Sequence, residues 1–386
     1  EVSVQYREIG NTGIKASTLG FGTMRYNSRE NAAEIIKRGL ELGITYFDIG
    51  SAYSWESPEE NAETWVGAAI ADVPRDQIIL SAKAQVRPGE KPHERAVANI
   101  GIRTRDEMRM SIENSLERVG VDRFDFYQFW DMSAQDHFEQ ACRGDDSPLA
   151  AMREAKEEGL VDHLGFTSHG QPGEIVQWLK EVPEFRTITV YYNFLDRYSE
   201  EAVDYARENG IGVNIMGPLR GGLLVGRSEV FARRMGELGD LPVQQIAIRF
   251  LLSHPGVTSV LSGVNEIPHL EENVSVAASE ETMSEEQRQA FVDAFMEFSH
   301  GEPLCTGCRY CQGACPEGIP VYQMMGLYQA AEIFGLDTAQ QKLEEAKAGD
   351  GLAASRCTGC EKCVEACPQD LPIPERMEKL AELVEK

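Results

Sequence analysis

Residues 44–53 read ITYFDIGSAY. Their first six residues form a short apolar run with the length of a buried strand, and Gly50 then interrupts it. Asp48 lies near the end of this run, and Tyr53 follows five residues later. Runs of the same kind lie at residues 19–23, 78–82, 124–129, 163–167, 188–192, 211–215 and 257–261.

Amphipathic stretches that resemble helices separate these runs. Examples lie at residues 31–42, 105–119, 149–158, 200–209 and 243–253. Thr104 with Glu107, and Ser284 with Gln287, have the spacing of helix capping boxes. The repeated alternation of strand and helix predicts a (β/α)8 TIM barrel. The alternative is an open doubly wound sheet, but its dinucleotide-binding form needs a third glycine where this chain has Arg25.

In a TIM barrel the chemistry is expected at the C-terminal ends of the strands. In this sequence those ends carry polar, aromatic or glycine residues. They are Gly22, Thr23, Met24, Asp48, Lys83, Trp130, Ser168, His169, Tyr192, Asn193, Met216, Gly217, Ser262 and Gly263.

The formal net charge of −26 argues against a nucleic-acid partner, because phosphate binding needs clustered Lys and Arg. No apolar run approaches the roughly 20 residues that a membrane span needs. The first residues have neither the basic nor the apolar region of a signal peptide. We therefore expect a cytoplasmic protein without a membrane partner.

Eight of the nine cysteines lie in two runs after residue 300, and Cys142 stands alone. Each run has the form C-x2-C-x2-C-x3-C-P, which is the bacterial ferredoxin spacing. In that pattern three thiolates bind one cluster and the fourth reaches the neighbouring cluster. We therefore predict one [4Fe–4S] cluster on Cys305, Cys308, Cys311 and Cys367, and a second on Cys357, Cys360, Cys363 and Cys315. Zinc is the alternative, but zinc ribbons use pairs of cysteines rather than four in one run closed by Pro.

Gly307 and Gly359 lie inside the two cysteine loops, where the backbone must approach sulfur closely. Between the loops, residues 320–349 have a helical pattern of apolar residues. We therefore predict two domains, a barrel over residues 1–300 and a small α-helical ferredoxin-like domain over residues 301–386.

The strand-end motifs resemble those of the aldo-keto reductases. The resemblance rests on LGFGTM at 19–24, YFDIGSAY at 46–53, SAK at 81–83, DFYQFW at 125–130 and GFTSH at 165–169. It extends to residues 216–222 and 262–274. The appended cysteine domain resembles the iron–sulfur branch of that superfamily.

This resemblance implies hydride transfer between NAD(P)H and a carbonyl by an Asp–Tyr–Lys–His tetrad. Asp48, Tyr53 and Lys83 fall on the first three positions. Tyr53 would be the general acid, and Lys83, aimed by Asp48, would lower its pKa. Trp130 stands where the family has His, and an indole can donate one N–H but cannot carry a proton. His137, just past the fourth strand, is a candidate to reach into the site instead.

The resemblance also implies contacts to the nicotinamide cofactor. Ser168, His169 and Asn193 would contact the nicotinamide carboxamide, Tyr192 would lie on or beside its ring, and Glu272 and Asn273 would contact adenine. Gly22, Thr23 and Met24 at the end of the first strand would also contact the cofactor. Backbone amides would bind the phosphates. They belong to Gly217, Leu219, Gly221, Gly222, Ser262 and Gly263.

Members specific for NADP usually carry a basic residue within 264–270, and this chain has no Lys or Arg there. NAD(H) is therefore at least as good a candidate as NADP(H). If a basic residue does supply the phosphate contact, Arg220 is the first suspect.

The strand-end aromatic residues predict a mouth that suits a flat ring compound or a sugar. Its residues are Met24, Tyr26, Trp55, Trp130 and Tyr192.

The sequence thus predicts a nicotinamide-dependent oxidoreductase acting on a small molecule. Loss of the tetrad His admits a redox-neutral enzyme, in which bound NAD+ transiently oxidises an alcohol to enable elimination or epimerisation. An electron-transfer protein is the third reading, and the intact Asp48, Tyr53 and Lys83 argue against it. The clusters could be structural, or they could deliver electrons to a substrate or to a redox partner at the cysteine domain.

Overall fold

The computed structural model of the chain describes residues 3–50, 52–85, 101–229, 241–297, 304–305, 307, 311, 313–349, 352–367 and 370–385. The chain divides into two compact units. Unit 1 comprises Glu1–Tyr191, Ser199–Met216 and His254–Glu281, and unit 2 comprises Tyr192–Tyr198, Gly217–Ser253 and Thr282–Lys386. Three segments that precede residue 300 thus group with the C-terminal part of the chain.

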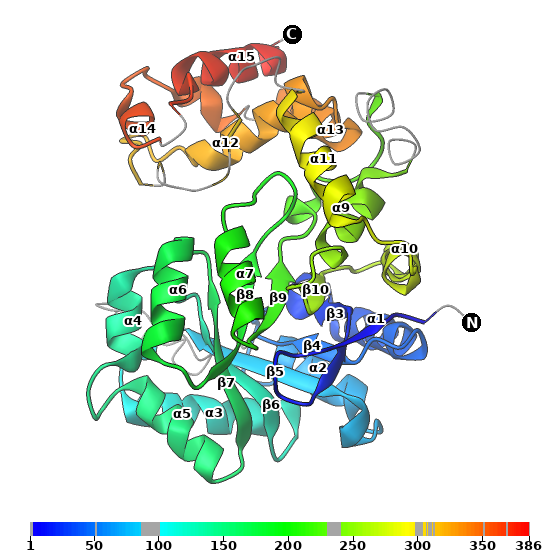
Figure 1. The fold of residues 1–386 in the computed structure, drawn as a ribbon, viewed down its shortest axis with the longest axis vertical. Coiled ribbons are helices and arrows are strands. Elements are labelled where there is room, and N and C mark those ends of the chain that lie inside the picture. Colours follow the sequence, from blue (N-terminus) through cyan, green and yellow to red (C-terminus); the bar gives the residue numbers. More distant parts are fainter. Residues whose placement is uncertain are drawn as a thin grey trace. The chain divides into compact units, whose positions relative to one another are not determined.

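Unit 1 contains a closed barrel of eight strands in the order β10-β3-β4-β5-β6-β7-β8-β9, and all neighbouring strands are parallel (Figure 1). The strands are β3 Leu19–Gly22, β4 Tyr46–Asp48, β5 Ile79–Gln85, β6 Phe124–Trp130, β7 Val161–Ser168, β8 Phe185–Tyr191, β9 Gly212–Met216 and β10 Ser259–Ser262. Closure confirms the predicted TIM barrel and excludes the open sheet.

Two strand ends differ from the sequence expectation. Strand β5 pairs with β6 from Ser81 opposite Phe126 to Gln85 opposite Trp130, so Lys83 lies within the strand rather than beyond it. Strand β8 ends at Tyr191, so the predicted strand residue Tyr192 lies outside the barrel. Hydrogen bonding to the neighbouring strand determines where each strand ends. The apolar pattern of the sequence does not encode that pairing.

Helices of unit 1 follow the strands and lie around the barrel (Figure 1). They are α1 Arg29–Glu41, α2 Ala62–Ile70, α3 Arg105–Val119, α4 Gln135–Cys142, α5 Pro148–Glu157, α6 Pro172–Glu181, α7 Glu200–Glu208 and α10 Ile267–Ala278. Helix α1 packs against α2 and α10, and α3 packs against α2 and α5. The capping box of Thr104 and Glu107 at the start of α3 is confirmed.

A hairpin that the sequence analysis missed, β1 Tyr6–Glu8 and β2 Lys15–Ser17, precedes the barrel. Ile9 and Ala16 from this hairpin pack with Tyr46 and Phe126 at the amino-terminal end of the strands. Residues that close this end are apolar, so the carboxyl ends of the strands remain as the place for polar chemistry.

Unit 2 is helical in the residues described. Its helices are α9 Val243–Leu252, α11 Glu285–Glu297, α12 Val321–Tyr328, the π-helical turn η6 Gln329–Ile333, α13 Asp337–Ala348, η7 Ala353–Arg356, α14 Lys362–Glu365 and α15 Ile373–Glu385. Helix α15 packs against α12, α13 and η7. The buried guanidinium of Arg376 on α15 lies 5.4 Å from the ring centroid of Tyr328 on α12. The predicted helices between the two cysteine runs are therefore present, as is the capping box of Ser284 and Gln287 at α11.

Among the residues described, no helix has the length and apolarity to cross a lipid bilayer.

Candidate functional site

An ion pair lies inside the barrel at the carboxyl ends of two neighbouring strands. Nζ of Lys83 on β5 is 2.6 Å from Oδ2 of Asp48 on β4, and the two side chains are 3% and 5% exposed. Burial, the largest single effect, would lower the pKa of Lys83, but the charges of Asp48 and Tyr53 and the hydrogen bonds of Lys83 with both together raise it. Lys83 therefore remains an ammonium, held in a site with little water.

The phenol of Tyr53 lies beside this ammonium. Nζ of Lys83 is 5.0 Å from the centroid of the Tyr53 ring. Burial raises the pKa of Tyr53, the charge of Lys83 and its hydrogen bond lower it, and the carboxylates of Asp48 and Asp131 raise it. The three tetrad residues predicted from sequence are thus brought together in unit 1.

Trp130, at the end of β6, packs against the same tyrosine. The ring centroids of Tyr53 and Trp130 are 5.2 Å apart and the ring planes are at 74°, which is an edge-to-face arrangement. Trp130 therefore places an apolar aromatic ring next to Tyr53, the predicted general acid.

The backbone that carries Tyr53 is fixed on both sides. A Cβ at Gly50 would lie 2.8 Å from Cε2 of Tyr53, so the ring rests directly on the glycine. The amide of Tyr53 donates to the carbonyl of Gly50, and the amide of Ala62, the first residue of α2, donates to the carbonyl of Tyr53.

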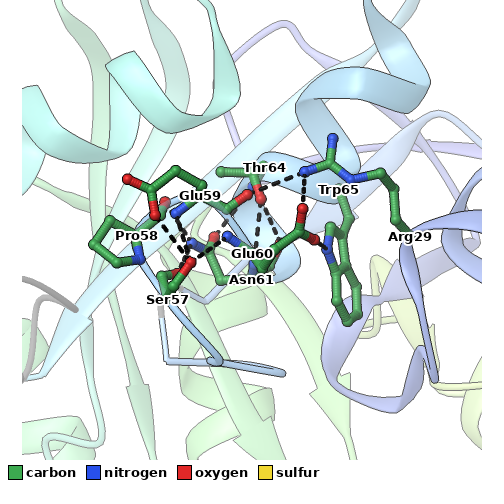
Figure 2. A network of polar contacts seen from close by, with 8 residues as sticks. All are labelled: Arg29, Ser57, Pro58, Glu59, Glu60, Asn61, Thr64 and Trp65. Atoms are coloured by element: carbon green, nitrogen blue, oxygen red, sulfur yellow. Dashed lines mark hydrogen bonds and ion pairs between the residues drawn. The ribbon is translucent and has the colours of Figure 1, made fainter.

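Figure 2 shows the polar network that holds the rest of this loop. The side-chain amide of Asn61 donates to the carbonyls of Ser57 and Pro58, and Asn61 forms a capping box with Thr64 at the start of α2. The carboxylate of Glu60 accepts hydrogen bonds from the indole of Trp65 at 2.7 Å and from Arg29 at 2.8 Å, which lower its pKa. These contacts restrict the loop and so restrict the position of Tyr53.

The residue after Trp130 is an unpredicted member of the site. Asp131 has a φ of +60°, a left-handed conformation that is uncommon for residues other than glycine. Its amide donates to Oγ1 of Thr167 at 2.8 Å, and its carboxylate accepts a hydrogen bond from the hydroxyl of Ser133. No sequence motif marks Asp131, because the turn that directs it is visible only in the backbone.

His137, the suggested substitute for the tetrad histidine, has another role here. Its Nδ1 lies 2.9 Å from the carbonyl oxygen of Asp131, so the imidazole holds the turn after β6. His169 is next to that turn, since its amide donates to the hydroxyl of Ser133 at 2.6 Å. Its ring lies 5.6 Å from the ring of Tyr191.

Several predicted cofactor residues use their side chains to fix backbone. The hydroxyl of Ser168 donates to the carbonyl of Met132 and accepts from the amide of Gly170. The hydroxyl of Thr23 donates to the carbonyl of Asp48 at 3.0 Å. Both side chains are fully buried, and a contact of Ser168 with the nicotinamide stays a prediction.

The ends of β3 and β10 meet at a surface that includes two glycines, Gly22 and Gly263. A Cβ at Gly22 would lie 3.4 Å from the amide nitrogen of Gly263, and the side chain of Arg25 packs on Gly263. The side-chain amide of Asn273 donates to the hydroxyl of Ser262 at 3.0 Å, while Glu272 is half-buried. This surface accommodates the close approach of a ligand, and Arg25 adds a positive charge beside it.

The predicted aromatic mouth is only partly formed. Tyr26 is 5% exposed and buries its hydroxyl, whereas Met24 is 48% exposed. The ring of Trp55 lies 5.7 Å from the guanidinium of Arg118. Tyr26 therefore belongs to the core of unit 1 rather than to a mouth.

Two predicted cofactor residues, Tyr192 and Asn193, are fully buried in unit 2. The hydroxyl of Tyr192 accepts a hydrogen bond from Arg288, and its ring lies 6.1 Å from that of Phe250. Asn193 uses its amide to donate to the carbonyl of Gly217 and its oxygen to accept from the amide of Leu195. Protein atoms thus surround the ring of Tyr192, and its contact with a nicotinamide stays a prediction.

The remaining predicted phosphate contacts lie in the loop after β9, also in unit 2. Gly217, Gly221 and Gly222 have φ values of +68°, +63° and +85°, so glycine is needed at each. The amide of Gly222 already donates to the carbonyl of Leu219 at 3.0 Å.

The cysteines of the second predicted cluster lie near one another. Burial raises the pKa of Cys363, and the neighbouring thiols of Cys357, Cys360 and Cys315 raise it further. Cys315 comes from the first run, as the ferredoxin pattern requires. For the first predicted cluster, Cys305, Cys311 and Cys367 lie in the described part of the chain, and Cys308 lies outside the described residues.

The cysteine loops have the local geometry expected from their glycines. Gly307 and Gly359 have φ values of +69° and +68° at the same place in the two Cys-Thr-Gly-Cys loops. Within the described part of the chain, no three Cys, His, Asp or Glu side chains are close enough to hold one metal ion.

The barrel and its buried Asp–Lys pair define a class of oxidoreductase, and comparison with known proteins gives its family. Residues 18–294 match the Aldo/keto reductase family and residues 304–371 match a 4Fe-4S dicluster domain. The first match covers more than half of the chain, so the chain belongs to the aldo/keto reductase family.

Individual relatives support this assignment at low identity. The chain is 26% identical to an uncharacterized oxidoreductase, YqkF, of Bacillus subtilis (strain 168), over 74% of this chain and 94% of the relative. It is 24% identical to the L-galactose dehydrogenase of Arabidopsis thaliana, over 76% of this chain and 95% of the relative. Aldo-keto reductase AKR11C1 from Bacillus halodurans, in its holo form, is similar in structure, with a TM-score of 0.63 and 25% identity over 75% of this chain and 96% of the other.

Proposed function

We propose that the protein transfers a hydride between a nicotinamide cofactor and a small carbonyl or alcohol substrate, with Tyr53 as general acid and base. The observation that carries this proposal is the buried Lys83–Asp48 pair beneath the Tyr53 ring. A buried ammonium without a reaction to support is costly, and ionisable groups held in this way are typical of active sites.

In the reducing direction Tyr53 donates its proton to the carbonyl oxygen. A bound nicotinamide would supply the hydride. Lys83 stabilises the tyrosinate that remains, and Asp48 keeps Lys83 charged and aimed at the phenol oxygen. In the oxidising direction the tyrosinate accepts the proton of the alcohol.

The residues around Tyr53 restrict the class of substrate that the site would accept. Trp130 offers an aromatic face, and Asp131 adds a carboxylate on the side of Tyr53. An aromatic face beside a carboxylate suits a neutral ring compound or a sugar, because ring C–H groups pack on the indole and hydroxyls donate to the carboxylate. A substrate that carries its own negative charge near the reacting carbon is disfavoured.

The nucleotide would use the turn at Ser262 and Gly263 of unit 1, and the resemblance separately implies phosphate contacts for the loop after β9. Its phosphates would meet backbone amides there, and Arg25 stands beside Gly263. His169 would contact the nicotinamide together with Ser168, and the ring of Tyr191 lies 5.6 Å from that of His169. NAD(H) stays at least as good a candidate as NADP(H), because no Lys or Arg lies within 264–270.

Two [4Fe–4S] clusters would occupy the cysteine runs, with the ligand sets given by the ferredoxin spacing. The proximity of Cys315 to Cys357, Cys360 and Cys363 supports the second set. A redox partner that exchanges single electrons would dock at this part of the chain.

The proposal is tested on anaerobically prepared protein by measuring iron and sulfide content together with NADH and NADPH binding. We expect about eight iron and eight sulfide per chain from two cubanes. We also expect NADH to bind no more weakly than NADPH. A preparation that binds neither nucleotide contradicts the hydride-transfer proposal.

The second candidate is a redox-neutral enzyme that retains its nucleotide. The indole of Trp130 at the place of the tetrad histidine favours it, because an indole cannot carry a proton as the family histidine can. The two candidates differ in nucleotide use. A redox-neutral enzyme copurifies with NAD+ and turns over without net change in it.

A further inference from the structure

The loop that follows β9 is bound to the helices of the cysteine-containing segment. We call residues 217–228 the β9 loop. The resemblance assigns it contacts with the nucleotide phosphates, and it lies within unit 2 together with α12 and α13. One packing contact and several hydrogen bonds connect the loop to these helices and to the residue just before α13.

The first contacts involve Arg220, which has a left-handed φ of +49°. Its guanidinium lies against Gly326 of α12, where a Cβ would be 2.2 Å from Nη2. Nη2 also donates to the carbonyl of Tyr322, 3.4 Å away in the preceding turn of α12. Arg220 is therefore engaged with α12, which argues against its predicted use as the phosphate-binding cation.

Further contacts join the end of the loop to the start of α13. The amide of Arg227 donates to Oδ2 of Asp337 at 3.0 Å, and the amide of Asp337 donates to the carbonyl of Arg227 at 3.2 Å. The hydroxyl of Thr338 donates to the carbonyl of Val225. The buried hydroxyl of Ser228 donates to the carbonyl of Phe334, just before α13.

The β9 loop thus has two connections of different kind. By chain continuity it extends from Met216 at the end of β9, and by hydrogen bonding it belongs with α12 and α13. A loop with four glycines at positive φ has much conformational freedom to lose on binding a ligand. Contacts that order it in advance reduce that cost.

We propose that α12 and α13 hold the β9 loop in its nucleotide-binding form, with Arg220, Asp337 and Thr338 as positioning residues, so that nucleotide affinity and the integrity of the cluster-bearing segment are linked. This inference rests on the proposed function. Because linkage is reciprocal, bound nucleotide also protects the segment and its clusters.

The test uses Gly326→Ala in the full chain with its clusters. The added methyl group collides with the far end of the flexible Arg220 side chain and displaces it. Alanine favours a helix over glycine, so α12 itself is not weakened. We expect the dissociation constant of NADH to rise by at least about fivefold, the lower end of typical coupling.

Gly349→Ala is the matched control. Gly349 follows α13, and its Cβ would meet the carbonyl oxygen of Glu345 at an ordinary 3.6 Å. This variant should bind NADH as the wild type does. If Gly326→Ala lowers iron content, Thr338→Val replaces it, since it removes the hydrogen bond to Val225 without adding bulk.

A second readout follows the clusters directly. Iron release to a ferrous chelator should be slower with saturating NADH in the wild type, and this protection should be smaller in Gly326→Ala. NADH affinity that is unchanged or tighter in Gly326→Ala, with normal iron content, overturns the inference while leaving the proposed function intact. Wild-type protein that binds neither NADH nor NADPH overturns the proposed function itself, and the inference with it.

Discussion

The indole of Trp130 stands edge-on to the phenol of Tyr53, with ring centroids 5.2 Å apart. The resemblance to the aldo-keto reductases implies a polar histidine imidazole at this position. Here an apolar ring packs against the proposed acid. The next residue, Asp131, carries a carboxylate whose charge raises the pKa of Tyr53. The site therefore differs from its family in the group that faces the substrate oxygen, while the Asp48–Lys83 pair is kept.

The Trp130→His variant tests whether the protein is an ordinary carbonyl reductase that has only lost the tetrad histidine. Electrostatic help to a developing alkoxide is worth about a hundredfold or more in rate. We expect no such gain, because the smaller imidazole leaves a void beside Tyr53 and loosens the ring that must be positioned. The measurement is kcat/KM with simple aldehydes, and a hundredfold rise over wild type would show that the site is an ordinary reductase lacking its helper.

The pH dependence of turnover tests the charges around Tyr53. Reduction needs the protonated phenol, and the anionic carboxylate of Asp131 raises the pKa of Tyr53 by opposing ionisation. Asp131→Asn should therefore lower that pKa, so that activity declines at a lower pH than in the wild type. Lys83→Met removes the charge that lowers the pKa, and should move the alkaline decline to higher pH.

Asp136→Asn is the control for the aspartate change, since it removes one negative charge from an exposed position five residues along the chain. Its pH profile should match the wild type. A profile of Asp131→Asn that does not move, or that moves to higher pH, contradicts the placement of this carboxylate beside Tyr53.

Gly50→Ala tests the contact that positions the ring of Tyr53. The new methyl group would lie 2.8–3.0 Å from three atoms of the Tyr53 ring, which must then move. Misplacing a catalytic group by about 1 Å costs on the order of a hundredfold, so we expect kcat to fall by tenfold or more. Gly173→Ala on α6, where a Cβ has no neighbour within 4 Å, should leave kcat unchanged.

Removal of single cysteines tests the cluster assignment. Cys315→Ser should reduce iron from about eight to about four per chain, because it removes one of four thiolates from the second cluster. Cys142→Ser should leave iron unchanged, since Cys142 lies on α4, where burial raises its pKa and keeps it a thiol. Full iron content in Cys315→Ser would show that this cysteine is not a ligand.

Features that depend on local spacing could be predicted from the sequence. The eight barrel strands, the capping box at Thr104 and the two cysteine runs are examples, because periodicity and fixed spacing encode them directly. The Asp48, Tyr53 and Lys83 cluster also follows from strand ends that meet on one side of a parallel barrel.

Features that depend on backbone direction or on distant packing could not be predicted from the sequence. Tyr191 and Tyr192 are neighbours in sequence, yet one faces His169 in unit 1 and the other is buried against Phe250 in unit 2. Asp131 is directed by a left-handed turn, and Arg220 by the space over Gly326, more than one hundred residues away in the chain. Neither relationship leaves a local pattern.

The account depends most on the hydroxyl of Tyr53, and Tyr53→Phe removes that oxygen with little change in shape. The measurement is anaerobic NADH consumption with a panel of aldehydes and ketones, in parallel with NADH binding. We predict that the variant binds NADH with wild-type affinity and that its turnover falls by at least about a hundredfold, because the general acid is missing. Full turnover in Tyr53→Phe would contradict the assignment of the active site, since no other group in the proposed mechanism supplies the proton.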